Sequence, residues 1–182
     1  MKKENSVIGA KMLAKLAMMT AISIVLLLIV RIPFPPAPFL VYDPADLPIY
    51  ITAFAYGPVA GVLVTLVVCL IQAFVLGGDG LYGFIMHFVA TGIVAIIIGL
   101  LYKKHKTKKR AVACLVVGVV ATTVIMCGLN LLITPLYMGT PVKAVMAMIP
   151  TVILPFNLLK AGINALLTFI LYKRVSGFLH NN

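Results

Sequence analysis

Hydrophobic residues occur along this chain in long runs, and the charged residues are confined almost entirely to the segments between them. The runs occupy residues 12–30, 46–57, 58–76, 81–102, 111–134 and 152–172. Each run except the second is long enough to cross a bilayer as a helix, which takes ~20 apolar residues. The pattern predicts an all-α integral membrane protein in which residues 1–182 form a single domain of six transmembrane helices.

The run at 46–57 is too short to span a bilayer as an ordinary helix. Pro48 lies near its start, and Gly57 and Pro58 end it. These residues predict a short or tilted second helix that a tight turn joins to the third helix. The alternative is a protein with five crossings, in which 46–57 is a re-entrant segment.

The basic residues predict the orientation. Four lie near the N-terminus, six in KKHKTKKR at 103–110 and two at 173–174, whereas the loops on the other side hold only Arg31 and Lys143. Because short loops rich in Lys and Arg stay in the cytoplasm, six helices place both termini there. Five helices would put the ends on opposite sides and break this asymmetry at one of them.

The composition excludes a soluble protein. Hydrophobic residues make up 63% of the chain, charged residues 10%, and the mean hydropathy is +1.15. The net charge of +11 does not indicate nucleic-acid binding, because no soluble domain presents the basic residues.

The first run ends in RIPFPP without a cleavage site, so we expect it to be retained as a helix. The cysteines, interpreted as small buried hydrophobic residues, are Cys69, Cys114 and Cys127.

Three connections face the outside in this arrangement. They are RIPFPPAPFLVYDPAD at 31–46, the GGDG turn at 77–80 and the connection at 135–151. Prolines make the first one stiff and extended, which suits the lid or wall of a site. Asp43, Asp46 and Asp79 lie on this face.

Polar residues interrupt the last run in the stretch VILPFNLLKAGIN at 152–164. Asn157, Lys160 and Asn164 fall within roughly 60° of one another on a helical wheel and form one polar stripe. A lysine at the centre of a membrane helix costs ~2.5–3.5 kcal/mol on insertion scales, so Lys160 needs a partner, a cavity or a ligand. Pro155 frees a backbone carbonyl nearby, as in helices that line cavities. We therefore predict that Asn157 and Lys160 bind a ligand.

Gln72, His87 and Asn130 are further polar residues inside the runs. Gln72 and Asn164 have an alternative role in hydrogen bonding between helices, and His87 has one in packing. Aromatic residues near the outer ends of the runs are candidates either to stack on a flat ligand or to anchor the protein at the membrane interface. They are Phe39, Tyr42, Phe84, Tyr137 and Phe156.

The sequence argues against an enzyme. It contains no HExxH motif, no GxSxG motif and no pair of acids at helical spacing within a run. It also lacks the GxxxxGK[ST] phosphate loop, so the chain cannot hydrolyse ATP by itself. If ATP powers transport, another subunit supplies it.

Two stretches resemble a known family. YDPADLPIYITAFAYGPVAGVLV at 42–64 resembles the loop, short second helix and turn of the substrate-binding S components of energy-coupling factor (ECF) vitamin transporters, especially those for riboflavin. ILPFNLLKAGIN at 153–164 resembles the last-helix motif of the same group, and Asn130 matches an asparagine of its fifth helix. The likeness covers nearly the whole chain.

The resemblance implies a substrate-capture subunit in a bacterial cell membrane that binds riboflavin or a related flavin from outside. Its partners would be a transmembrane coupling protein and two cytoplasmic ATPases, and no cofactor of its own is implied. Asn130, Asn157 and Lys160 would bond the flavin, and the loop from Asp43 to Asp46 would close over it. Ala17 and Ala21 form an AxxxA pattern on the first helix, and this face would meet the coupling protein.

Some positions depart from the riboflavin pattern. Members of that type usually carry Glu, Lys and Asn on the third helix, where this chain has Thr65, Val68 and Cys69, and a fourth-helix Asn is His87 here. An S component for another vitamin is therefore an alternative. A stand-alone carrier driven by an ion gradient is a second one, but it needs a titratable acid within a helix. A membrane scaffold without a ligand is a third.

Overall fold

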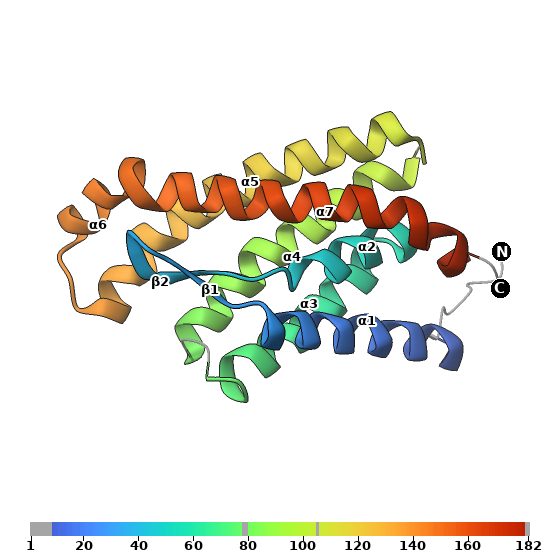
Figure 1. Cartoon of the computed structure of the whole chain (residues 1–182), viewed down its shortest axis with the longest axis horizontal. Coiled ribbons are helices and arrows are strands. Elements are labelled where there is room, and N and C mark those ends of the chain that lie inside the picture. The colour runs from blue at the N-terminus through green and yellow to red at the C-terminus, as the bar shows by residue number, and fades with distance from the viewer. Residues whose placement is uncertain (1–8, 78–79, 105, 181–182) are drawn as a thin grey trace, which may run out of the picture.

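The computed structural model describes residues 9–77, 80–104 and 106–180 (Figure 1). Its helices are α1 (Ala10–Ile29), α2 (Asp46–Tyr56), α3 (Pro58–Phe74), α4 (Gly80–Lys104), α5 (Lys108–Met138), α6 (Val142–Met148), the π-helix η1 (Ile149–Ile153) and α7 (Leu154–His180). Four helices of the described residues are long and apolar enough to cross a membrane, when α6 to α7 is counted as one continuous helix. The prediction of a helical membrane protein with a short second helix is confirmed.

The first outer connection forms a β-hairpin, a local feature that the sequence did not predict within the helical fold. β1 (Ile32–Phe34) and β2 (Ala37–Tyr42) pair antiparallel, with an irregular register between Pro33 and Phe34. The prolines indicated an extended backbone but argued against pairing, because proline cannot donate to a β-ladder. A short hairpin tolerates them at its edges and turn.

The predicted connection at 135–151 is mostly helical, which is a correction to the sequence analysis. The helix α5 continues through Pro135 to Met138 and ends where Gly139 adopts a φ of +64°. The next helix begins at Val142, and η1 joins it to α7 without a break. Proline is more frequent in membrane helices than in soluble ones, so Pro135 was a poor indicator of a helix end.

Close backbone contacts hold α2, α3 and α4 together. A Cβ atom placed on Gly61 would lie 2.9 Å from the Ala53 Cβ and 3.1 Å from the Ala95 Cβ. At the turn between α2 and α3, Pro58 packs directly on the backbone of Gly99. Small residues allow this approach, which is the usual way in which membrane helices associate.

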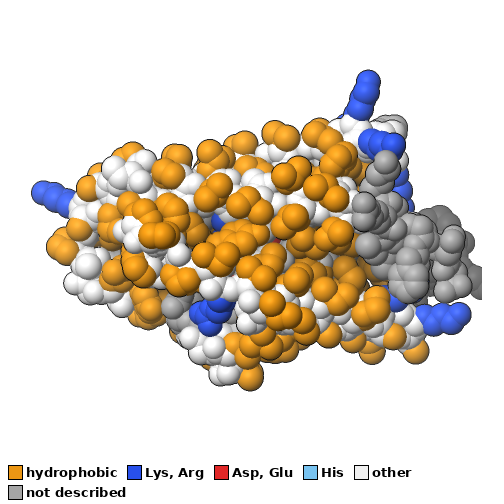
Figure 2. Space-filling view, in the orientation of Figure 1, with side chains coloured by type: hydrophobic (Ala, Val, Ile, Leu, Met, Phe, Trp, Pro, Cys, Tyr) orange, Lys and Arg blue, Asp and Glu red, His pale blue; other side chains and the backbone are white. Residues whose placement is uncertain are grey.

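Apolar side chains cover most of the face of the molecule seen in Figure 2. Large exposed hydrophobic residues occur on all four long apolar helices, with Ile29, Val124, Leu132 and Leu166 at 60% exposure or more. Basic side chains gather at the end of the molecule where α1 begins and α4 meets α5 (Figure 2). A surface of this kind is suited to a lipid environment rather than to water.

We predict that Gly99→Ala destabilises the protein, because the new Cβ would lie 2.7 Å from the Pro58 Cα and Cδ. Overpacking of this kind typically costs about 1–3 kcal/mol. Thermal unfolding in detergent measures the effect. Gly92→Ala on the same helix is the matched control, since a Cβ there meets nothing within 4 Å. Equal unfolding temperatures for the two variants would contradict the prediction.

Candidate ligand-binding site

A cavity of about 310 Å³ lies among the β-hairpin, α3, α4, α5 and α7. Ligand pockets in proteins usually measure ≈ 300–1,000 Å³, so the cavity has room for a compact small molecule. Seven of the eight predicted binding residues lie on its wall. These are Asp43, Asp46, Gln72, His87, Asn130, Asn157 and Lys160.

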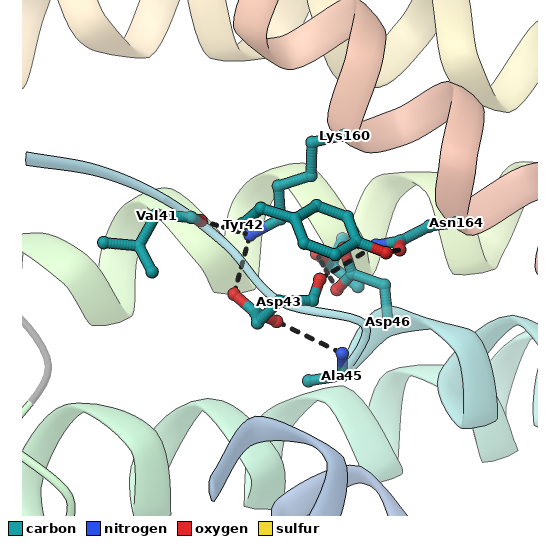
Figure 3. A network of polar contacts seen from close by, with 8 residues as sticks. Val41, Tyr42, Asp43, Ala45, Asp46, Lys160 and Asn164 are labelled. Carbon is teal, nitrogen blue, oxygen red and sulfur yellow. Dashed lines mark hydrogen bonds and ion pairs between the residues drawn. The ribbon is translucent and has the colours of Figure 1, made fainter. Parts of the chain in front are cut away.

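Lys160 of α7 forms an ion pair with Asp43, which lies in the link between β2 and α2 (Figure 3). The Lys160 Nζ donates to the Asp43 Oδ2 at 2.8 Å and to the Val41 carbonyl oxygen at 3.3 Å. Both charged side chains are buried. The sequence indicated that Lys160 needs a partner, a cavity or a ligand, and the structure provides both a partner and a cavity.

Asp43 is fixed by its own backbone as well as by Lys160. The Ala45 backbone N–H donates to the Asp43 Oδ1 at 3.1 Å. The Asp43 carboxylate therefore accepts one hydrogen bond from α7 and one from the backbone just before α2.

Asn164 lies behind the wall of the cavity and connects the two acids. Its Nδ2 donates to the Asp43 carbonyl oxygen at 3.3 Å and to the Asp46 Oδ2 at 3.4 Å, and its Oδ1 accepts from the Tyr42 hydroxyl at 3.3 Å (Figure 3). The other Asp46 oxygen accepts from the Thr91 hydroxyl of α4 at 3.0 Å. Asn164 is completely buried, so its geometry favours the alternative role, hydrogen bonding between elements.

Asn130 and Asn157 are held by their own helices. The Asn157 Nδ2 donates to the Ile153 carbonyl oxygen and the Asn130 Nδ2 to the Met126 carbonyl oxygen, each at 2.8 Å. The Thr134 hydroxyl donates to the Asn130 Oδ1, also at 2.8 Å. These bonds fix both amides in position on the wall, which lowers the entropy lost when a ligand binds.

The irregular helix before Asn157 also contributes to the site. The π-helix η1 contains Pro150, and Pro155 follows in the first turn of α7. Each proline removes a backbone donor, and π-helical turns are frequent at functional sites. Phe156 and Asn157, which come directly after this irregularity, both line the cavity.

The aromatic predictions divide into two groups. Phe39, Tyr137 and Phe156 line the cavity, together with Tyr82, which the sequence analysis did not single out. Phe84 instead stacks on Phe88 with the ring planes 3° apart, and the Tyr42 hydroxyl bonds Asn164.

Sequence reasoning missed the backbone carbonyl of Val41 and the hydroxyl of Thr91. No sequence signal marks the carbonyl. Thr91 follows His87 by four residues, so the two lie on one face of α4, and this spacing could have indicated it. Asp79 lies outside the described residues.

A cavity lined by both polar and apolar groups within a helical membrane protein is typical of small-molecule binding or transport proteins. Within that class, residues 11–172 match the family described as ECF transporter, substrate-specific component. The chain belongs to this family. Its members are transporter components, so the prediction that the chain is not an enzyme is confirmed.

Individual relatives agree with this assignment. The chain is 30% identical to the riboflavin transporter RibU of Staphylococcus aureus (strain TCH60), over 93% of this chain and 92% of that protein. It is 33% identical to the riboflavin transporter FmnP of Bacillus subtilis (strain 168), over 82% of this chain and 84% of that protein. A solved structure, described as the S component of a bacterial ECF transporter, matches with a TM-score of 0.79 and 29% identity, over 93% of this chain and 97% of the other.

We predict that Asn164→Ala loosens the attachment of the hairpin and of the start of α2 to α7. The variant loses the bonds to Asp43, Asp46 and Tyr42, so hydrogen exchange at 37–46 should be faster by about tenfold, the factor for ~1.4 kcal/mol. Thr168→Val is the control, because Thr168 is equally buried but bonds only within α7. Unchanged exchange in Asn164→Ala would show that the amide does not fasten the hairpin.

Proposed function

We propose that this chain is the substrate-capture subunit of an ATP-driven ECF importer and binds riboflavin or a related flavin from outside a bacterial cell membrane. The observation that carries the proposal is the buried cavity of about 310 Å³, with fixed amides and an ion-paired lysine on its wall. Two relatives at 30% and 33% identity are named riboflavin transporters, which supports the choice of ligand.

The chemistry of the wall suits a flavin. Riboflavin combines a flat three-ring system, which has two carbonyl groups and an N–H along one edge, with a chain of hydroxyl groups. Asn130 and Asn157 carry amides, which both donate and accept, and Lys160 donates. Phe39 and Phe156 offer ring faces against which a flat ligand can stack.

The arrangement of the helices supports six crossings with both termini in the cytoplasm. The start of α1 and the end of α7 lie at one end of the molecule, where basic side chains gather, and the hairpin lies toward the other end (Figures 1 and 2). With 11 residues, α2 reaches only about half of the ~30 Å hydrocarbon layer. The strand β2, which leads into α2, would make up the rest of the second crossing.

The exposed face of α1 supports association with a membrane partner. Ala14, Ala17 and Ala21 lie on this face, while Leu16 and Met19 point into the bundle. Small residues on a lipid-facing helix allow another helix to approach closely. A transmembrane coupling protein, joined to two cytoplasmic ATPases, is the partner that we propose for this face.

We predict that the purified protein binds riboflavin and quenches its fluorescence. Asn157→Leu removes a polar group from the wall at similar volume and should weaken binding by about tenfold, which is ~1.4 kcal/mol. Thr151→Val is the control, because Thr151 is exposed and bonds only within its own helix. Binding of another vitamin but not of riboflavin would keep the family and reject the ligand. Gradient-driven uptake by the chain alone in ATP-free liposomes would favour a stand-alone carrier.

We predict that Ala17→Leu combined with Ala21→Leu blocks transport but not binding. Bulky side chains on the face that we propose for coupling should reduce ATP-dependent riboflavin uptake by at least about tenfold in proteoliposomes containing the coupling protein and ATPases. The control is Ile22→Phe, which adds bulk about 100° round the helix from Ala21. Normal uptake by the double variant would contradict the assignment of this face.

A further inference from the structure

Lys160 enters the cavity with most of its bonding capacity already used. An ammonium group has three N–H donors, and here one goes to the Asp43 carboxylate and one to the Val41 carbonyl. One donor remains for a ligand. Because its charge is matched by Asp43 at 2.8 Å, Lys160 acts toward the cavity as a fixed hydrogen-bond donor rather than as a free cation.

We propose that Asp43 determines the charge selectivity of the cavity. By neutralising Lys160, it makes the site accept an uncharged ligand that has carbonyl or hydroxyl acceptors. A ligand that carries a carboxylate or phosphate into the cavity would lose its hydration without gaining an unpaired cation in return. The inference rests on the proposed function, since it takes the ligand to be a flavin.

The other charged groups on the wall do not restore a positive site. Asp46 adds a second buried carboxylate, and its oxygens accept hydrogen bonds from Thr91 and Asn164. Arg31, also on the wall, is an exposed residue, so water screens its charge. On α4, the titratable residues of the wall are Tyr82 and His87. The buried part of the wall therefore carries no unmatched fixed cation among the described residues.

Two flavins of similar size, one uncharged and one anionic, test the proposal. One carries a hydroxyethyl group and the other a carboxymethyl group, each on the ring nitrogen that bears the hydroxyl chain in riboflavin. The affinity of each is measured by fluorescence quenching. The wild-type protein should prefer the uncharged flavin. Asp43→Asn keeps the shape of the side chain but removes the carboxylate paired with Lys160 at 2.8 Å, so the ratio of the two affinities should shift toward the anionic flavin by at least about tenfold.

Asp46→Asn is the matched control, because it also removes one carboxylate from the wall, but Asp46 bonds Thr91 and Asn164 and, among the described residues, forms no ion pair with Lys160. We expect a clearly smaller shift for it. Equal shifts in the two variants would overturn the proposal, since they would assign selectivity to the total charge rather than to the ion pair. An unchanged ratio in Asp43→Asn would overturn it as well.

A double variant covers the case in which Asp43→Asn fails to fold. Asp43→Asn with Lys160→Gln removes both charges of the pair, leaves neither partner with an unpaired charge, and should return the ratio close to the wild-type value. A ratio far from the wild-type value in the double variant contradicts the inference. Failure of the wild-type protein to bind riboflavin itself overturns the proposed function and this inference with it. Riboflavin binding without the expected shift overturns this inference alone.

Discussion

The ion pair between Asp43 and Lys160 is the interaction on which the arrangement of the site depends. Two buried charges cost several kcal/mol each to desolvate, and removing one partner of such a pair typically costs about 3–5 kcal/mol. Loss of either partner would therefore leave the other buried charge without its counter-ion. Because Asp43 belongs to the link between the hairpin and α2, the pair fixes that link against α7 and closes one side of the cavity.

Polar contacts between different elements are concentrated around this pair. Several threonines elsewhere in the described helices bond back to their own backbone, as Thr52 does to Pro48 and Thr123 to Val119. The bonds that join α7 to the hairpin, the link and α2, and α4 to α2, are made by residues 41–43 and Asp46. Elsewhere α2, α3 and α4 associate through small residues. Close helix packing therefore holds one part of the bundle together, and polar contacts hold together the part that surrounds the cavity.

The sequence predicted the parts of this structure that depend on periodicity and on the cost of burial. Hydrophobic runs gave the helices, and the buried charge of Lys160 required a partner or a cavity. It did not predict which partner, because Asp43 is 117 positions away in the chain and a helical wheel identifies a face but not what packs on it. The hairpin and the helix from Val142 were missed because each depends on how proline is tolerated in its surroundings.

The positions that depart from the riboflavin pattern bear on how a ligand would be held. Thr65 and Val68 of α3 are buried and are not part of the cavity wall, and Thr65 bonds the Gly61 carbonyl of its own helix. Cys69 and Gln72 are the α3 residues that reach the wall beside Ala73. Polar side chains come mainly from α4, α5, α7 and the hairpin link, so polarity is distributed unevenly round the cavity. A ligand with one hydrogen-bonding edge and an apolar face matches such a wall better than one that is polar on all sides.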